Sequence, residues 1–124
     1  MEKTGLWRLS AYQFHYEGAH GLDAVLRGVG DMEGFWASLE AKYSAGAKLD
    51  RYQLGNIRQG SEMYIGTRLA TYVYRGGQNA ATAEMLMGKL RGGWMESYFS
   101  AGGNLFKLQT SGKDISGKTL ITPK

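Results

Sequence analysis

Residues 62–77, E-M-Y-I-G-T-R-L-A-T-Y-V-Y-R-G-G, constrain the fold most, because they hold the densest run of bulky, β-favouring side chains in the chain. With a period of two, a mainly apolar face alternates with a face rich in tyrosine and arginine. The first face is Met63, Ile65, Thr67, Leu69, Thr71 and Val73, and the second is Tyr64, Gly66, Arg68, Ala70, Tyr72 and Tyr74. The pattern predicts a central strand over 62–74, ended by two glycines.

A helical interpretation of the same region places arginines among its apolar residues. Burying such charges without a neutralising partner is costly, whereas the strand interpretation needs no partner. We therefore favour a hairpin with strands at 48–58 and 62–74, although a helix that begins at Asp50 stays open for the first of them. The arginines that share a sector with Leu54, Ile57, Ile65 and Leu69 in the helical interpretation are Arg51, Arg58, Arg68 and Arg75.

Two long amphipathic helices are predicted on either side of this hairpin. Asp31 is a favourable N-cap for the first, over 31–43, and Asn79 for the second, over 80–99. Large apolar residues then recur at spacings of three and four. They are Met32, Phe35, Trp36, Leu39 and Tyr43 in the first, and Ala83, Leu86, Met87, Leu90, Trp94 and Tyr98 in the second.

Shorter elements complete the prediction of an α+β fold, in which a small antiparallel sheet packs against two longer amphipathic helices. We expect strands at 8–16 and 104–110, a short helix at 20–29 and an edge strand at 119–122. A mostly α-helical bundle is the alternative, which the 19 glycines disfavour. The length predicts a single globular domain over 1–110, followed by a polar C-terminal tail over 111–124.

Charge is unevenly distributed along the chain. Residues 1–41 carry three basic against six acidic residues, and residues 42–124 carry twelve against five. The basic part suits a surface that binds polyanions, although ordinary solubilising charge explains it equally well. With no apolar stretch long enough to span a membrane and no visible secretory signal, we expect a cytoplasmic protein without a membrane partner.

The residues that enzymes and metal sites require are scarce. Cysteine is absent, and serine occurs in no nucleophile-elbow pattern. The turns Ser111-Gly112-Lys113 and Ser116-Gly117-Lys118 lack the spacing and context of a phosphate-binding loop. We therefore predict neither catalysis nor a metal or cofactor. The one cluster with metal-ligand types, in a spacing that matches no known site, is His15, Glu17, His20 and Asp23.

Aromatic and basic residues interleave in the central region and point to binding. Such residues stack on bases and contact phosphates in single-strand binders, but they also form protein interfaces or pack in cores. Our leading hypothesis is a non-enzymatic protein that binds nucleic acid or a partner protein in a nucleoprotein complex. The candidate binding residues are Arg58, Tyr64, Arg68, Tyr72, Tyr74, Arg75, Lys89 and Arg91.

In composition the chain is similar in kind to accessory proteins of phages and mobile elements. Two other classes of function stay open. The glycine and alanine residues of the helix at 80–99 would let identical chains approach closely, which predicts a self-assembling structural subunit, a homo-oligomer, as the alternative. A small enzyme of unknown type is the third hypothesis.

Overall fold

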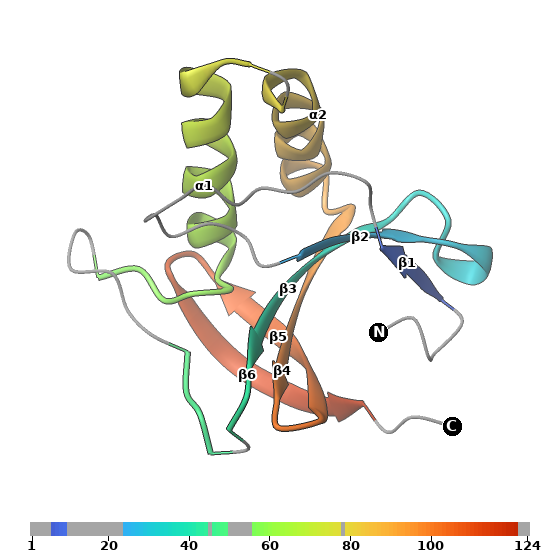
Figure 1. Cartoon of the computed structure of the whole chain (residues 1–124), viewed down its shortest axis with the longest axis vertical. Coiled ribbons are helices and arrows are strands. Elements are labelled where there is room, and N and C mark those ends of the chain that lie inside the picture. Colours follow the sequence, from blue (N-terminus) through green and yellow to red (C-terminus); the bar gives the residue numbers. More distant parts are fainter. Residues whose placement is uncertain (1–5, 10–23, 45, 50–55, 78, 122–124) are drawn as a thin grey trace.

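Two helices stand over one end of a curved, six-stranded sheet in the computed structural model (Figure 1). The structure describes residues 6–9, 24–44, 46–49, 56–77 and 79–121. In chain order the elements are β1 (Trp7–Leu9), β2 (Ala24–Gly28), the 3-10 helix η2 (Gly30–Met32), β3 (Trp36–Lys42), α1 (Glu62–Arg75), α2 (Ala80–Arg91), β4 (Met95–Ala101), β5 (Asn104–Ser111) and β6 (Asp114–Ile121).

The sheet is mixed, and its strands lie in sequence order from β1 to β6. Neighbouring strands are antiparallel except β3 and β4, which run parallel from Trp36 beside Met95 to Lys42 beside Ala101. Parallel strands cannot be joined by a tight hairpin, and the connection between these two contains both helices. The prediction of a small antiparallel sheet is therefore wrong, and so is the alternative of a helical bundle.

Residues 62–75 form helix α1 and not the predicted central strand. Ser61 caps the helix, because its Oγ accepts a hydrogen bond of 3.2 Å from the backbone N–H of Tyr64. Gly76, with φ of 72°, ends it in a backbone conformation that favours glycine. The predicted cost of burying arginine is reduced at Arg68, because this residue is only half-buried and its guanidinium carbon lies 5.4 Å from the centre of the Tyr64 ring.

The predicted helix over 31–43 is also wrong. Residues 30–32 form η2, and Trp36–Lys42 form β3, which lies between β2 and β4 in the sheet. Ala37, Ser38 and Glu40 of this strand are all buried, so both of its faces are covered. A strand buried on both faces loses the polar and apolar alternation by which strands are recognised, and its apolar residues can imitate helical spacing.

The predicted helix over 80–99 is correct only in its first part. Helix α2 ends at Arg91, and Gly93, with φ of 80°, turns the chain into strand β4. The prediction of a helix over 20–29 is wrong where the structure describes it, because Ala24–Gly28 form β2. The strand predicted over 104–110 is confirmed by β5, and residues 114–121 form the edge strand β6.

Two predictions fall partly outside the described residues. Of the strand predicted over 8–16, the structure describes only residues 8 and 9, which belong to β1. Residues 50–55 of the ambiguous segment 48–58 also lie outside the described part of the chain.

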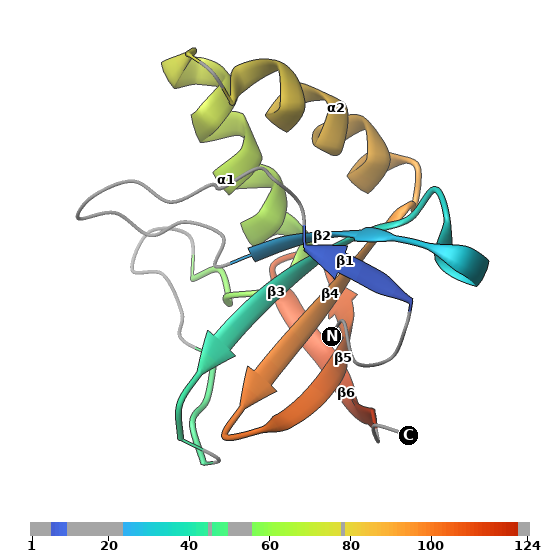
Figure 2. The ribbon, with the colours of Figure 1, turned by 45° about the vertical axis from the view of Figure 1, so that its right-hand side comes forward.

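The side chains on the two faces of the sheet belong to separate hydrophobic clusters. On one face, Val25, Trp36 and Met95 meet the buried side of the two helices. On the other face, Trp7 of β1 reaches Tyr98 of β4 with ring centres 5.7 Å apart. A flat sheet would separate these strands by roughly 14 Å, because two strands lie between them. The sheet is therefore strongly curled, as Figure 2 shows for β1 and β2 above β3 and β4.

Leu69 of α1 is fully buried in the cluster beneath the helices. We predict that Leu69→Ala lowers the free energy of unfolding by about 2 to 5 kcal/mol, because it removes buried methyl groups and leaves a cavity. Met63→Ala on the same helix is the control, since the Met63 side chain is 45% exposed. Urea denaturation monitored by circular dichroism measures both, and equal losses for the two variants would contradict the burial of Leu69.

Candidate functional site

Two of the predicted binding tyrosines lie in the protein core. Tyr64 is 0% exposed and Tyr72 is 6% exposed, and both belong to the cluster that also contains Leu69 and Leu86. Their rings are packed against neighbouring side chains of the same chain. In this structure they offer no surface on which a base can stack.

Two of the predicted arginines make contacts within the fold. Arg58 places its Nε 3.1 Å from Asp114 Oδ1 and donates from Nη1 to the carbonyl oxygen of Leu49 at 2.8 Å. Because Asp114 begins β6, this pair ties the segment before α1 to the hairpin of β5 and β6. Arg68 lies over the ring of Tyr64, as described above.

The remaining four predicted residues lie at two separate places. Tyr74 and Arg75 end α1, whereas Lys89 and Arg91 are in the last turn of α2. The helices run in opposite directions (Figure 1), so these two pairs lie at opposite ends of the helical hairpin. A 14-residue helix such as α1 is about 20 Å long. The structure thus does not gather the eight predicted residues into one surface.

The helical hairpin has an outer face that the sequence analysis did not identify. On α1 it consists of residues opposite the buried ones, spaced by three and four. Met63 and Tyr74 are 45% and 92% exposed, and Met85 of α2 is 38% exposed. We define the outer face by its exposed residues Met63, Thr67, Ala70 and Tyr74 of α1 and Ala81, Met85 and Gly88 of α2. The spacing becomes informative only once residues 62–75 are known to be helical.

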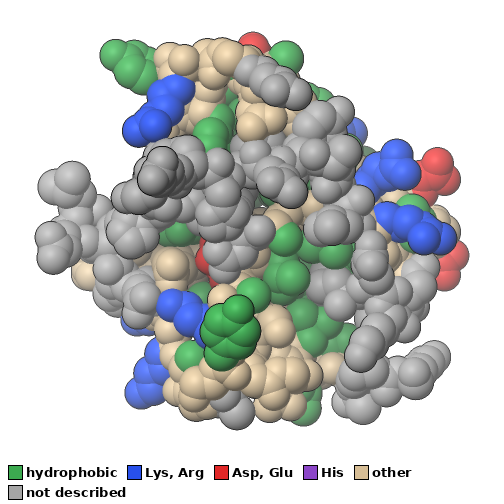
Figure 3. Space-filling view, in the orientation of Figure 1, with side chains coloured by type: hydrophobic (Ala, Val, Ile, Leu, Met, Phe, Trp, Pro, Cys, Tyr) green, Lys and Arg blue, Asp and Glu red, His purple; other side chains and the backbone are tan. Residues whose placement is uncertain are grey.

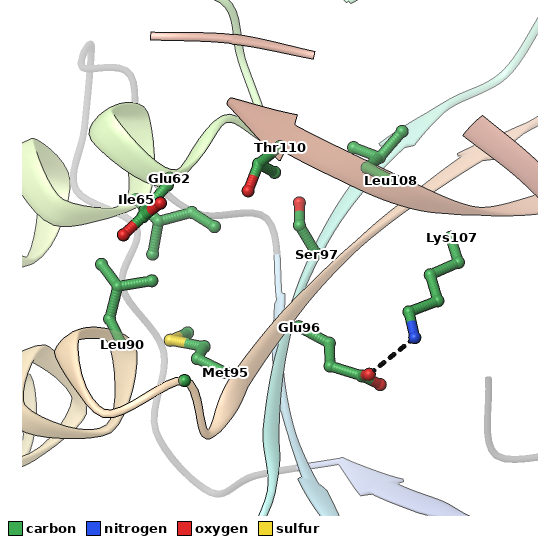
Figure 4. Close-up of a pocket in the computed structure, with 10 residues that line it drawn as sticks. Glu62, Ile65, Leu90, Met95, Glu96, Ser97, Lys107, Leu108 and Thr110 are labelled. Atoms are coloured by element: carbon green, nitrogen blue, oxygen red, sulfur yellow. Dashed lines mark ion pairs between the residues drawn. The ribbon is translucent and has the colours of Figure 1, made fainter. Parts of the chain in front are cut away.

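A pocket of about 300 Å³ lies where β4 and β5 separate beneath the helices (Figure 4). The pairing of these strands begins at Ser97 and Leu108, so Met95 and Glu96 extend beyond it, and β5 is irregular at Gln109 and Thr110. We call this cavity the β4–β5 pocket. Its lining residues are Glu62, Ile65, Leu90, Gly93, Met95, Glu96, Ser97, Lys107, Leu108 and Thr110.

A polar network lies at one side of the pocket. Glu96 accepts a hydrogen bond of 2.8 Å from the hydroxyl of Tyr98 and lies 2.8 Å from Nζ of Lys107. Burial raises the pKa of Tyr98, and the hydrogen bond to Glu96 and its negative charge raise it further. A hydrogen bond from the Trp7 side chain acts in the opposite direction. Tyr98 therefore keeps its proton and acts as a donor.

This network was not predicted from the sequence, because Glu96 and Tyr98 were assigned to a helix over 80–99. In a helix, residues two apart point in different directions, whereas in strand β4 they lie on the same face of the sheet. Lys107 is directly opposite Tyr98 in β5. Residues 95–101, M-E-S-Y-F-S-A, do not alternate between apolar and polar side chains, so the sequence carried no clear strand signal there, and the apolar spacing of α2 continues into them.

The described residues form neither a metal site nor a membrane-spanning helix. Within the described ranges, no three His, Asp or Glu side chains are placed to hold a metal ion, and the cluster of His15, Glu17, His20 and Asp23 lies outside those ranges. Neither helix of the described chain combines the length and apolar character needed to cross a membrane.

The raised pKa of Tyr98 predicts a loss of stability in alkali. An unfolded tyrosine loses its proton near pH 10, whereas folded Tyr98 retains it to higher pH. Above about pH 10 the unfolded state therefore binds fewer protons, and the free energy of unfolding falls as pH rises. Tyr98→Phe should reduce this fall between about pH 9 and pH 11, as measured by urea denaturation. Tyr74→Phe, at a 92% exposed position, should leave it unchanged, so equal falls in both variants would contradict the prediction.

No family model matches this chain, and it matches neither a curated protein nor a solved structure. The outer face of the helices and the β4–β5 pocket are the two features from which a function can be inferred.

Proposed function

We propose that this chain is a non-enzymatic binding protein whose outer face docks on another protein, one that belongs to a nucleic-acid-handling complex. The exposure of Met63 and Tyr74 on α1 and of Met85 on α2 is the observation that carries this proposal. Methionine and tyrosine are enriched in protein interfaces, and amphipathic helices commonly bind through such anchors. A cytoplasmic location and a role in a phage or mobile element stay predictions from composition.

The charges around the outer face indicate what kind of protein surface it binds. The residues that define the outer face are uncharged, and the exposed Glu84 lies next to them on α2. Arg75 lies at one end of the hairpin and Lys89 and Arg91 at the other. A partner with an apolar centre flanked by acidic groups complements this arrangement. The partner we propose is therefore a protein with such a surface.

Nucleic acid fits the exposed surface less well than a protein does. A nucleic-acid site needs basic groups gathered along a groove or face, with aromatic rings free to stack. Figure 3 shows Lys and Arg side chains at several separate places on one face of the molecule. Of the three tyrosines predicted to stack, only Tyr74 is exposed.

Self-assembly is a second candidate, supported by Gly88. This glycine lies inside α2, where glycine costs up to about 1 kcal/mol relative to alanine. A Cβ added to it would meet nothing within 4 Å in the chain itself. Packing within the described chain thus does not require the glycine, whereas close approach of a second copy would.

Photo-crosslinking tests the protein-partner proposal. We expect a photoreactive phenylalanine derivative at position 74, expressed in the native host, to give a discrete crosslinked product with one protein. Met85→Glu should abolish that product, because it places a negative charge in the uncharged outer face. The matched controls are the crosslinker at Leu120, which is 54% exposed on β6, and Thr119→Glu, which adds the same charge there.

Three outcomes decide between the candidates. A crosslink from position 74 that Met85→Glu removes and Thr119→Glu leaves supports the protein partner. Salt-dependent binding of purified protein to single- or double-stranded nucleic acid, weakened by Arg75→Ala and Arg91→Ala, would overturn it in favour of nucleic acid. A crosslink from position 74 to the chain itself would favour self-assembly.

Gly88→Ala tests self-assembly separately. The substitution should raise the stability of the monomer by up to about 1 kcal/mol, because alanine is the better helix former and has room for its Cβ. If copies meet at α2, the same methyl group should weaken the oligomer. Light scattering across a concentration series measures the mass, and Gly66→Ala, whose Cβ would lie 3.5 Å from Leu90 Cδ2, is the control inside α1. A monomeric mass for the parent protein at all concentrations would exclude self-assembly through this face.

A further inference from the structure

We propose that the β4–β5 pocket binds a small organic cation, an alkylammonium or alkylguanidinium group on a short aliphatic body. The pocket has a free carboxylate at its edge and apolar side chains at its floor. Its volume of about 300 Å³ is near the lower limit of the volumes of ligand-binding pockets. This inference does not depend on the outer face or on any protein partner.

The free carboxylate is that of Glu62. It is exposed in the first turn of α1 at the edge of the pocket, and within the described chain it has no ion-pair or hydrogen-bond partner. The other carboxylate of the pocket, Glu96, is already bound to Tyr98 and Lys107. Two carboxylates against one ammonium leave the pocket with a net negative charge, which a cation neutralises.

An anion is the wrong ligand for this pocket, even though a helix begins there. Helix N-termini bind anions through N–H groups that have no partner. In α1 the N–H groups of Met63, Tyr64 and Ile65 already donate to Gly112 O, Ser61 Oγ and Ser61 O at 3.0, 3.2 and 3.0 Å. Among the described residues only the N–H of Glu62 lacks a partner in this first turn, and the Glu62 carboxylate beside it repels an anion.

A second polar group lines the pocket beside the carboxylate. The hydroxyl of Thr110 has no hydrogen-bond partner among the described residues, in contrast to Ser97, whose hydroxyl donates to the carbonyl of Gly60 at 2.6 Å. A hydroxyl oxygen accepts hydrogen bonds as well as donating them. Glu62 and Thr110 thus supply the acceptors that an ammonium or guanidinium group with several N–H bonds requires.

The floor of the pocket selects for an aliphatic body. Ile65 and Leu108 are 1% and 5% exposed, and Leu90 and Met95 complete the apolar lining. Given about 30 Å³ for each water-sized group, the cavity holds a ligand of roughly ten heavy atoms. A short alkyl chain fills this space and keeps its charged end at the Glu62 side.

Methionine-methyl NMR tests the proposal at the pocket itself. In full-length protein with ¹³C-methyl methionine, titration with n-butylammonium or n-butylguanidinium should shift the Met95 signal saturably. The Met63 and Met85 signals on the outer face should stay in place, and Met95→Leu assigns the Met95 signal. The neutral analogue n-butanol should bind at least tenfold more weakly, because it lacks the charge that Glu62 recognises.

Variants identify the recognition groups. Glu62→Gln should weaken binding of n-butylammonium roughly tenfold to a hundredfold, since it removes a charge-assisted hydrogen bond. Glu84→Gln is the matched control, because Glu84 is an exposed carboxylate of α2 outside the pocket. Thr110→Val should weaken binding several-fold. Circular dichroism and the unfolding midpoint of each variant establish that it is folded.

The NMR titrations of the parent protein and its variants decide whether the pocket is a cation site. A saturable Met95 shift that Glu62→Gln weakens and Glu84→Gln leaves unchanged supports the cation site. Equal affinity for n-butanol and n-butylammonium, equal effects of the two Gln variants, or no Met95 shift up to about 10 mM probe would overturn it. Nα-acetyl-lysine amide, which keeps its charged ε-ammonium group, distinguishes two sources of the cation. Binding as tight as that of n-butylammonium would support the site and identify a lysine side chain as its ligand. Tighter binding of n-butylammonium would support a free amine.

Discussion

The parallel pairing of β3 with β4 is the constraint on which the rest of the structure depends. Parallel neighbours require a connection that returns to the same end of the sheet, and residues 43–94 provide it. Both helices lie within that connection, so they must stack over one face of the sheet. The outer face of the hairpin and the β4–β5 pocket both follow, because the second helix ends where β4 begins and the pocket lies beneath that junction.

The sequence predicts those elements whose local signals are unopposed. The strand at 104–110 is flanked by glycine turns, and the start of α2 has a clear apolar stripe. The central elements were mistaken for one another, because their burial comes from distant partners. Trp36 and Leu39 show helical spacing, yet they belong to a strand held by β2 and β4. Residues 62–75 alternate like a strand. Ser61 caps the start of helix α1 and Gly76 caps its end, but both residues were interpreted as parts of turns.

The candidate sites were less predictable than the fold, since they combine side chains from several elements. The importance of residues 62–75 was visible in their composition, but the side that faces solvent depends on the period assigned to them. With a strand period of two, Tyr64, Tyr72 and Tyr74 fall on the same face. In helix α1, Tyr64 and Tyr72 are buried and Tyr74 is exposed. Glu62, Glu96 and Thr110 come from a helix and two strands. Their spacing in the sequence therefore does not predict the pocket that they line.

The contacts between the start of α1 and the turn that joins β5 to β6 make two distant segments one cooperative unit. Met63 and Arg58 donate their backbone N–H groups to Gly112 and Lys113, and the Arg58 side chain holds Asp114. The first N–H groups of a helix ordinarily exchange quickly with solvent, because no earlier carbonyl protects them. Here the amide hydrogen of Met63 can exchange only when the helix start and the hairpin turn move apart. Fraying of α1 is thereby coupled to opening of the sheet edge, some fifty residues later in the chain.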